Sequence, residues 1–185
     1  VLKIGGKHLD SEGYDLLGLI TGSEGLLGVV TEVTVRILKK PESVRAVLIG
    51  FDSIEDSGNC VADIIARGIV PAGMEIMDKP LIIATDNYAK AGYPRDVEAL
   101  LIVELDGTTS EVDTLIDKVL DIAKMNKASY NRASNSDAER LRFWKGRKAA
   151  FTACGVLAPD YICMDGSIPR NKLADVLGYI CLLYT

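Results

Sequence analysis

Hydrophobic positions recur along the chain with two different periods, and the alternation between these periods predicts the secondary structure. The clearest helix has apolar residues at three- and four-residue spacing, at Val112, Leu115, Ile116, Val119 and Leu120. Short runs rich in β-branched residues predict strands. Beyond residue 43 the predicted strands are 44–51, 73–77, 98–105, 128–132 and 160–168. The predicted helices begin at Ser53, Lys79, Ser110, Ser136 and Asn171, and the helix from Ser136 runs through Phe151.

These strands and helices follow each other as strand–helix–strand units. Ser53 with Asp56, Ser110 with Asp113 and Ser136 with Glu139 are side-chain pairs typical of helix starts. Two split β-α-β units predict an α+β fold of the ferredoxin-like kind, with a mainly antiparallel sheet and helices on one face.

The first 40 residues have a different pattern. A short apolar helix is predicted at Asp15–Thr21, and glycines then punctuate Gly22–Gly28. The β-branched run Val29–Ile37 alternates with period two after Thr31 and predicts a strand, which Lys39 and Lys40 end. We place a domain boundary there. Without its own sheet, this strand has an apolar edge that favours pairing with a second copy of the chain.

Composition and charge narrow the class of protein. The chain has 185 residues, 48% of them hydrophobic, a net charge of −5 and a pI near 5.0, which disfavours a nucleic-acid-binding protein. The cysteines (Cys60, Cys154, Cys163 and Cys181) lack paired spacing, which favours reduced thiols. His8 is the single histidine and is expected at the surface, so no metal site is predicted. No apolar run is long enough to span a membrane.

Two segments carry candidate chemistry, and the residues alone leave each open. Gly22–Gly28 is not a GxGxxG motif and does not open a helix after a strand, so it does not predict a Rossmann site. It is either a structural turn or a place where backbone approaches a flat ligand. Arg147 is either a surface residue, as expected for Arg140 and Arg142, or a carboxylate ligand through two parallel hydrogen bonds.

Three longer strings resemble a known family. TGSEGLLGVVTEVTVRILKKPE (21–42) resembles the end of the FAD-binding domain in flavoproteins of the vanillyl-alcohol-oxidase type. FWKGRKAAF (143–151) and APDYICMDGSIPRNKL (158–173) resemble the C-terminal domain of FAD-linked oxidases, most closely in the glycolate oxidase branch. The resemblance implies that residues 1–40 are the C-terminal tail of an FAD-binding domain and residues 41–185 a substrate or cap domain, both incomplete.

The resemblance also implies a cofactor and site residues. FAD would be lined by Gly22, Ser23, Glu24, Gly25, Gly28, Val29 and Val30. Arg147, in the W-x-x-R pattern with Trp144, would face the substrate carboxylate. Cys163 stands where relatives with larger or dianionic substrates have a lysine, which favours a small monocarboxylate. The complete protein would oxidise a small 2-hydroxy acid, such as glycolate or D-lactate, to the 2-oxo acid with hydride transfer to flavin.

The resemblance further implies partners and a location. Other oxidase subunits are expected, including an iron–sulfur subunit, in the cytoplasm or at the inner face of the membrane. The family's pyrophosphate-binding loop and histidine-rich motif are not found in the chain, so the chain is expected to be an inactive fragment. The competing interpretation is a non-enzymatic ferredoxin-like module that regulates or docks a partner.

Overall fold

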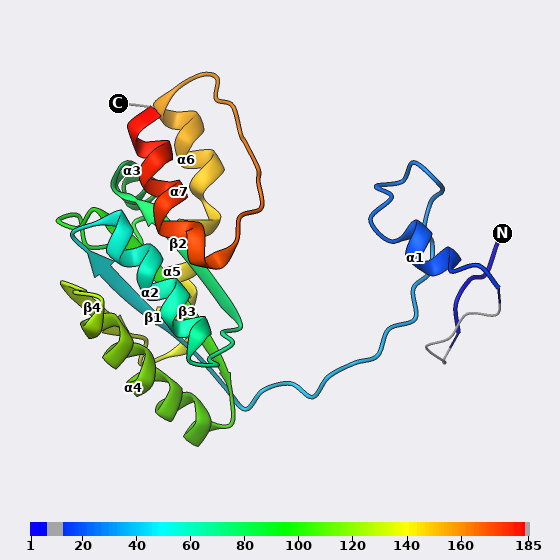
Figure 1. Cartoon of the computed structure of the whole chain (residues 1–185), viewed down its shortest axis with the longest axis horizontal. Helices are drawn as coiled ribbons and strands as arrows, with labels where there is room; N and C mark the ends of the chain where they lie inside the picture. The colour runs from blue at the N-terminus through cyan, green and yellow to red at the C-terminus, as the bar shows by residue number, and fades with distance from the viewer. Residues whose placement is uncertain (7–12, 184–185) are drawn as a thin grey trace. The chain divides into compact units, whose positions relative to one another are not determined.

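The computed structural model describes residues 1–6 and 13–183, so His8 lies outside the described residues. The chain divides into two compact units, Val1–Lys39 and Lys40–Thr185. The first unit contains α1 (Leu16–Ile20). The second contains β1 (Ser43–Phe51), α2 (Ile54–Ala66), β2 (Gly73–Asp78), α3 (Lys79–Ala89), β3 (Ala99–Gly107), α4 (Thr109–Met125), β4 (Tyr130–Ala133), α5 (Asp137–Lys148), α6 (Ala150–Leu157), a 3-10 turn (Arg170–Lys172) and α7 (Leu173–Leu183) (Figure 1).

A four-stranded sheet forms the centre of the second unit. Its strand order is β2-β3-β1-β4, and every neighbouring pair is antiparallel. In the central pair, β1 with β3, Val47 lies directly opposite Val103. Because α2 joins β1 to β2 and α4 joins β3 to β4, the chain makes two split β-α-β units. The predicted ferredoxin-like α+β fold with an antiparallel sheet is thereby confirmed.

Helices cover both faces of the sheet, so the prediction that they lie on one face is wrong. On one face Ile64 of α2 and Ile116 of α4 pack against Val47 and Val103. On the other face Ile82 of α3 and Phe143 of α5 pack against strand residues that include Leu48 and Ile102. The run Ala46–Ile49 is apolar at every position, which is the pattern of a strand buried on both sides.

Helix starts follow local sequence closely. The Ser53 hydroxyl accepts hydrogen bonds from the N–H groups of Glu55 and Asp56, and the Ser136 hydroxyl accepts one from Glu139, as predicted. The N-cap of helix α4 is Thr108, two residues before the predicted cap at Ser110. Thr108 and Glu111 form a capping box, so the predicted pair of Ser110 with Asp113 is wrong.

Two predicted strands and one predicted helix differ in the structure. Residues 29–37 and 160–168 form no strand. Val33, Val35 and Ile37 are exposed, because alternation defines a face but cannot supply the partner whose hydrogen bonds make a strand. The predicted helix 136–151 is two helices, since α5 ends at Lys148 and α6 begins at Ala150. Over the described ranges, no helix combines the length and apolarity needed to cross a membrane.

Candidate functional site

Helix α5 sits on the sheet face that it shares with α3 (Figure 1). Phe143 and Gly146 are its buried residues. Trp144 and Arg147 are half-buried on the same helix, at a spacing that places side chains on neighbouring positions of one face. The predicted W-x-x-R pair is therefore presented toward the β2 side of the sheet, where Trp144 contacts Gly73.

The Glu104 carboxylate on β3 binds two side chains of this face, Trp144 and Arg140. Glu104 Oε2 accepts hydrogen bonds from Trp144 Nε1 at 2.6 Å and from Arg140 Nη1 at 2.9 Å. A Cβ added at Gly73, which pairs with Glu104 across the strands, would lie 3.3 Å from the Trp144 ring. Arg140 is only 19% exposed, so the expectation that it is a plain surface arginine is wrong. Its two carboxylate partners, Glu104 and Asp137, draw it onto the sheet.

A second carboxylate, on β2, holds Arg147. Glu75 Oε2 accepts from Arg147 Nε at 3.2 Å and from Arg147 Nη2 at 3.1 Å. The Arg147 side chain is 31% exposed. By contrast Arg142 lies exposed on the same helix, 3.6 Å from Glu139. Sequence reasoning found Arg147 and Trp144 but missed Glu75 and Glu104, because strand register, and not sequence spacing, brings these carboxylates under α5.

The Tyr93 hydroxyl bridges two backbone groups of α5. It donates to the carbonyl oxygen of Phe143 and accepts from the N–H of Arg147 at 3.0 Å. A Cβ at Gly146 would overlap the Tyr93 ring, so only glycine leaves room for this approach. Tyr93 lies in the loop after α3, which Asp86 ties down through bonds to nearby backbone N–H groups and to Arg95.

Because the Tyr93 hydroxyl is buried, we expect the unfolding free energy to fall in alkali. Burial raises the pKa of Tyr93 to about 12, against the opposing hydrogen bond from the Arg147 N–H. Below a pH of about 10 the neutral Tyr93 hydroxyl contributes its full share of the unfolding free energy. This contribution is lost as pH rises toward about 12, because the tyrosine ionises at a lower pH in the unfolded chain than in the folded one. The full loss is about 2 to 3 kcal/mol of unfolding free energy.

Urea unfolding of the chain between about pH 9 and about pH 11.5 measures this loss. Tyr93→Phe has no group to ionise, so its stability should fall less steeply over the same interval. Parallel slopes for the two proteins would show that Tyr93 ionises in the folded state as it does in water.

The candidate cofactor segment lies in the first unit. Gly22 and Gly25 have φ angles of +78° and +82°, and an added Cβ at either would meet nothing within 4 Å. Glu24 also has a positive φ, +51°. Ser23 donates its N–H to Ile20, whereas within the described residues the N–H groups of Gly25, Gly28, Val29 and Val30 donate to no protein acceptor. Free donors on an open glycine turn fit a planar ligand with acceptor atoms, such as a flavin.

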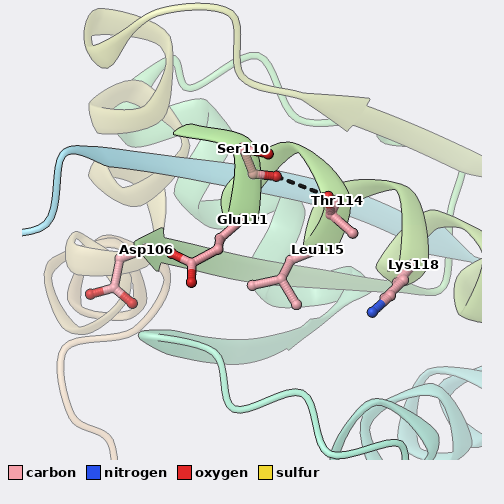
Figure 2. Close-up of a pocket in the computed structure, with 6 residues that line it drawn as sticks. All are labelled: Asp106, Ser110, Glu111, Thr114, Leu115 and Lys118. Atoms are coloured by element: carbon pink, nitrogen blue, oxygen red, sulfur yellow. Dashed lines mark hydrogen bonds between the residues drawn. The ribbon is translucent and has the colours of Figure 1, made fainter. Parts of the chain in front are cut away.

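A shallow hollow of about 430 Å³ lies elsewhere, along the start of α4 (Figure 2). Its lining residues are Asp106, Ser110, Glu111, Thr114, Leu115 and Lys118. None is a predicted site residue. Glu111 is already used by the helix cap, since its Oε2 accepts from the Thr108 hydroxyl and N–H, and these bonds lower its pKa. Cys163 is exposed in the irregular segment between α6 and the 3-10 turn.

Comparisons with known proteins place these features in context. Residues 40–181 match the family described as FAD linked oxidases, C-terminal domain. The chain is 52% identical to the glycolate oxidase subunit GlcD of Escherichia coli K12, over 98% of this chain and 36% of that protein. It is 34% identical to the GlcD subunit of Bacillus subtilis, over 97% of this chain and 38% of that protein. The chain thus spans little more than a third of these relatives.

Two further relatives are more distant. A D-lactate dehydrogenase of Anaerostipes hadrus is 28% identical, over 91% of this chain and 37% of that protein. Among solved structures, an alkyldihydroxyacetonephosphate synthase superposes with a TM-score of 0.67 at 16% identity, covering 93% of this chain and 37% of that one. The structural likeness supports the fold alone.

Proposed function

Because the chain belongs to the FAD-linked oxidases, through the C-terminal domain of that family, we propose that it is part of an FAD-dependent 2-hydroxy-acid oxidoreductase. Residues 41–185 form the substrate-side domain, and residues 1–40 are the end of the FAD-binding domain. The observation that carries the proposal is the half-buried Arg147, held on the sheet by Glu75 with part of its guanidinium unused.

Arg147 has the geometry to bind a substrate carboxylate. The planar guanidinium can donate two parallel hydrogen bonds and so fix the carboxylate together with the adjacent C2. Fixing C2 lowers the entropic part of the barrier to its oxidation. Trp144 stands beside Arg147 on α5 and supplies an apolar wall, with its Nε1 turned to Glu104. A small monocarboxylate such as glycolate or D-lactate suits the uncharged Cys163.

The cofactor is assigned to the glycine segment. Gly22, Ser23, Glu24, Gly25, Gly28, Val29 and Val30 line the flavin, partly by backbone N–H groups that are free in the described residues. When bound, FAD supplies the acceptor for the hydride that leaves C2. The glycines keep side chains out of the way of the ring, and the two valines offer apolar contact.

Partner subunits are part of the proposal. Two of the relatives are named as subunits of glycolate oxidase, which supports a multi-subunit enzyme. We assign an iron–sulfur subunit as the electron-accepting partner on the basis of the family resemblance. The alternative, a regulatory ferredoxin-like module, gives no reason for the Trp144–Arg147 pair or for the glycine-rich turn, and family membership weighs against it.

The test is reduction of bound flavin by substrate in the complete protein that carries these residues. Anaerobic addition of glycolate or D-lactate should bleach the visible flavin absorbance, since electrons leave the 2-hydroxy acid. An acid that lacks the 2-hydroxyl, such as acetate or propionate, is the matched control and should bleach nothing. A protein that binds no flavin, or flavin that no 2-hydroxy acid reduces, would contradict the proposal.

A further inference from the structure

Glu75 uses one oxygen to hold one edge of Arg147. Both contacts, from Nε at 3.2 Å and from Nη2 at 3.1 Å, end on Oε2. Glu75 lies on β2, an edge strand, on the same sheet face as Glu104 and under α5. Its side chain is 41% exposed, so the pair stands at the border between sheet and solvent.

This arrangement leaves one group on each partner without a hydrogen bond. The Nη1 end of Arg147 and the Oε1 atom of Glu75 make no hydrogen bond within the part of the chain that the structure describes. A carboxylate can therefore bind the outer edge of the guanidinium, through Nη1 and Nη2, without displacing Glu75. In that geometry the bound carboxylate has a negatively charged oxygen of Glu75 as its neighbour.

We propose that Glu75 positions Arg147 and selects monocarboxylates over dicarboxylates at the same site. The inference rests on the proposed function, because it takes Arg147 as the carboxylate ligand. Holding the inner edge fixes the plane of the guanidinium and hence the direction of the outer one. Selection follows from the negative charge of Glu75.

The Arg147–Glu75 pair has no net charge, so one incoming carboxylate leaves the site with a charge of −1. A second carboxylate on the substrate would add another negative charge near Glu75 with no cation to match it, and like charges at close range disfavour binding. The other carboxylate on this face, Glu104, is already matched by Arg140. Glu75 is therefore the group that rejects a second negative charge.

The experiment replaces Glu75 with glutamine in the complete protein. Steady-state kinetics are measured with D-lactate as the monocarboxylate and D-malate as the dicarboxylate. For Glu75→Gln, the ratio of kcat/KM for D-malate to that for D-lactate should rise roughly tenfold, because a like charge is removed. KM for D-lactate should rise roughly threefold with kcat little changed, because a neutral amide holds the guanidinium less firmly.

Glu98→Gln is the matched control, since it removes the same charge from an exposed pair with Lys79. It should leave the ratio unchanged, and both variants should melt near the wild-type temperature. An unchanged ratio in Glu75→Gln, while Arg147→Ala loses activity, would overturn the role of Glu75 and leave the proposed function intact. Full activity in Arg147→Ala would instead overturn the carboxylate role itself.

Discussion

Replacing Arg147 with alanine in the complete protein should lower kcat/KM for glycolate or D-lactate by roughly ten- to a hundredfold. A charge-assisted contact to the substrate carboxylate contributes about 1.5 to 3 kcal/mol, and loss of orientation at C2 adds to this. Folding should change little, because the ion pair with Glu75 is partly exposed and such pairs contribute about 1 kcal/mol or less. Steady-state kinetics and thermal melts on the same preparation separate the two effects.

Arg147→Lys and Arg142→Ala complete the series. Lysine should restore only part of the activity, since a point charge cannot reproduce two parallel hydrogen bonds. Arg142 is the control because it lies exposed on the same helix, whereas Arg140 bridges Glu104 and Asp137 and would disturb Trp144. Near wild-type kcat/KM in a folded Arg147→Ala protein would show that Arg147 has no substrate role.

Replacing Asp86 with alanine should lower the unfolding free energy by about 3 kcal/mol, through loss of a nearly buried carboxylate that several donors share. Asp86 Oδ1 accepts from the N–H groups of Gly92 and Tyr93, and Oδ2 accepts from Arg95 Nε and Nη2. These donors would be left without partners. For a unit of this size the melting temperature should fall by roughly 10 °C. Asp117→Ala, an exposed change on α4, should be nearly neutral.

The charge of Asp86 also makes the unfolding free energy depend on pH in the acid range. Burial alone would raise its pKa, but the hydrogen bonds from Arg95, Tyr93 and Gly92 together lower it below the ordinary value. The stabilisation is therefore present above a pH of about 4 and is lost as pH falls further, through the lowered pKa. Wild type and Asp86→Asn should converge in stability in acid. A difference in unfolding free energy that stays constant down to about pH 2 would contradict this.

Much of the fold follows from local sequence, and the errors have identifiable causes. Ser53 and Ser136 cap helices as predicted, because the acceptor and its donors lie within one turn. At α4 the predicted cap at Ser110 is wrong, because Thr108 and Glu111 form a reciprocal capping box. The break between α5 and α6 at Ala149 has no local signal, since no proline or glycine stands there.

The site was only half predictable for a similar reason. The sequence around Trp144 and Arg147 resembles FAD-linked oxidases, and this resemblance predicts that Arg147 binds a substrate carboxylate. Glu75 and Glu104 are 72 and 40 residues away from the side chains that they hold, and only the strand register of β2 and β3 brings them together. Whether residues 22–30 line a flavin stays a prediction, because the first unit is described by itself.

The Tyr93 hydroxyl, set between the Phe143 carbonyl and the Arg147 N–H, has a consequence for exchanging parts between relatives. The tyrosine needs a glycine at 146 to reach the helix backbone, and the loop that carries it needs Asp86. A chimaera that joins this α5 to a loop without the tyrosine would therefore lose the hydrogen bond that the Arg147 N–H donates. When segments are exchanged between relatives, α5 and the loop after α3 should therefore be transferred together.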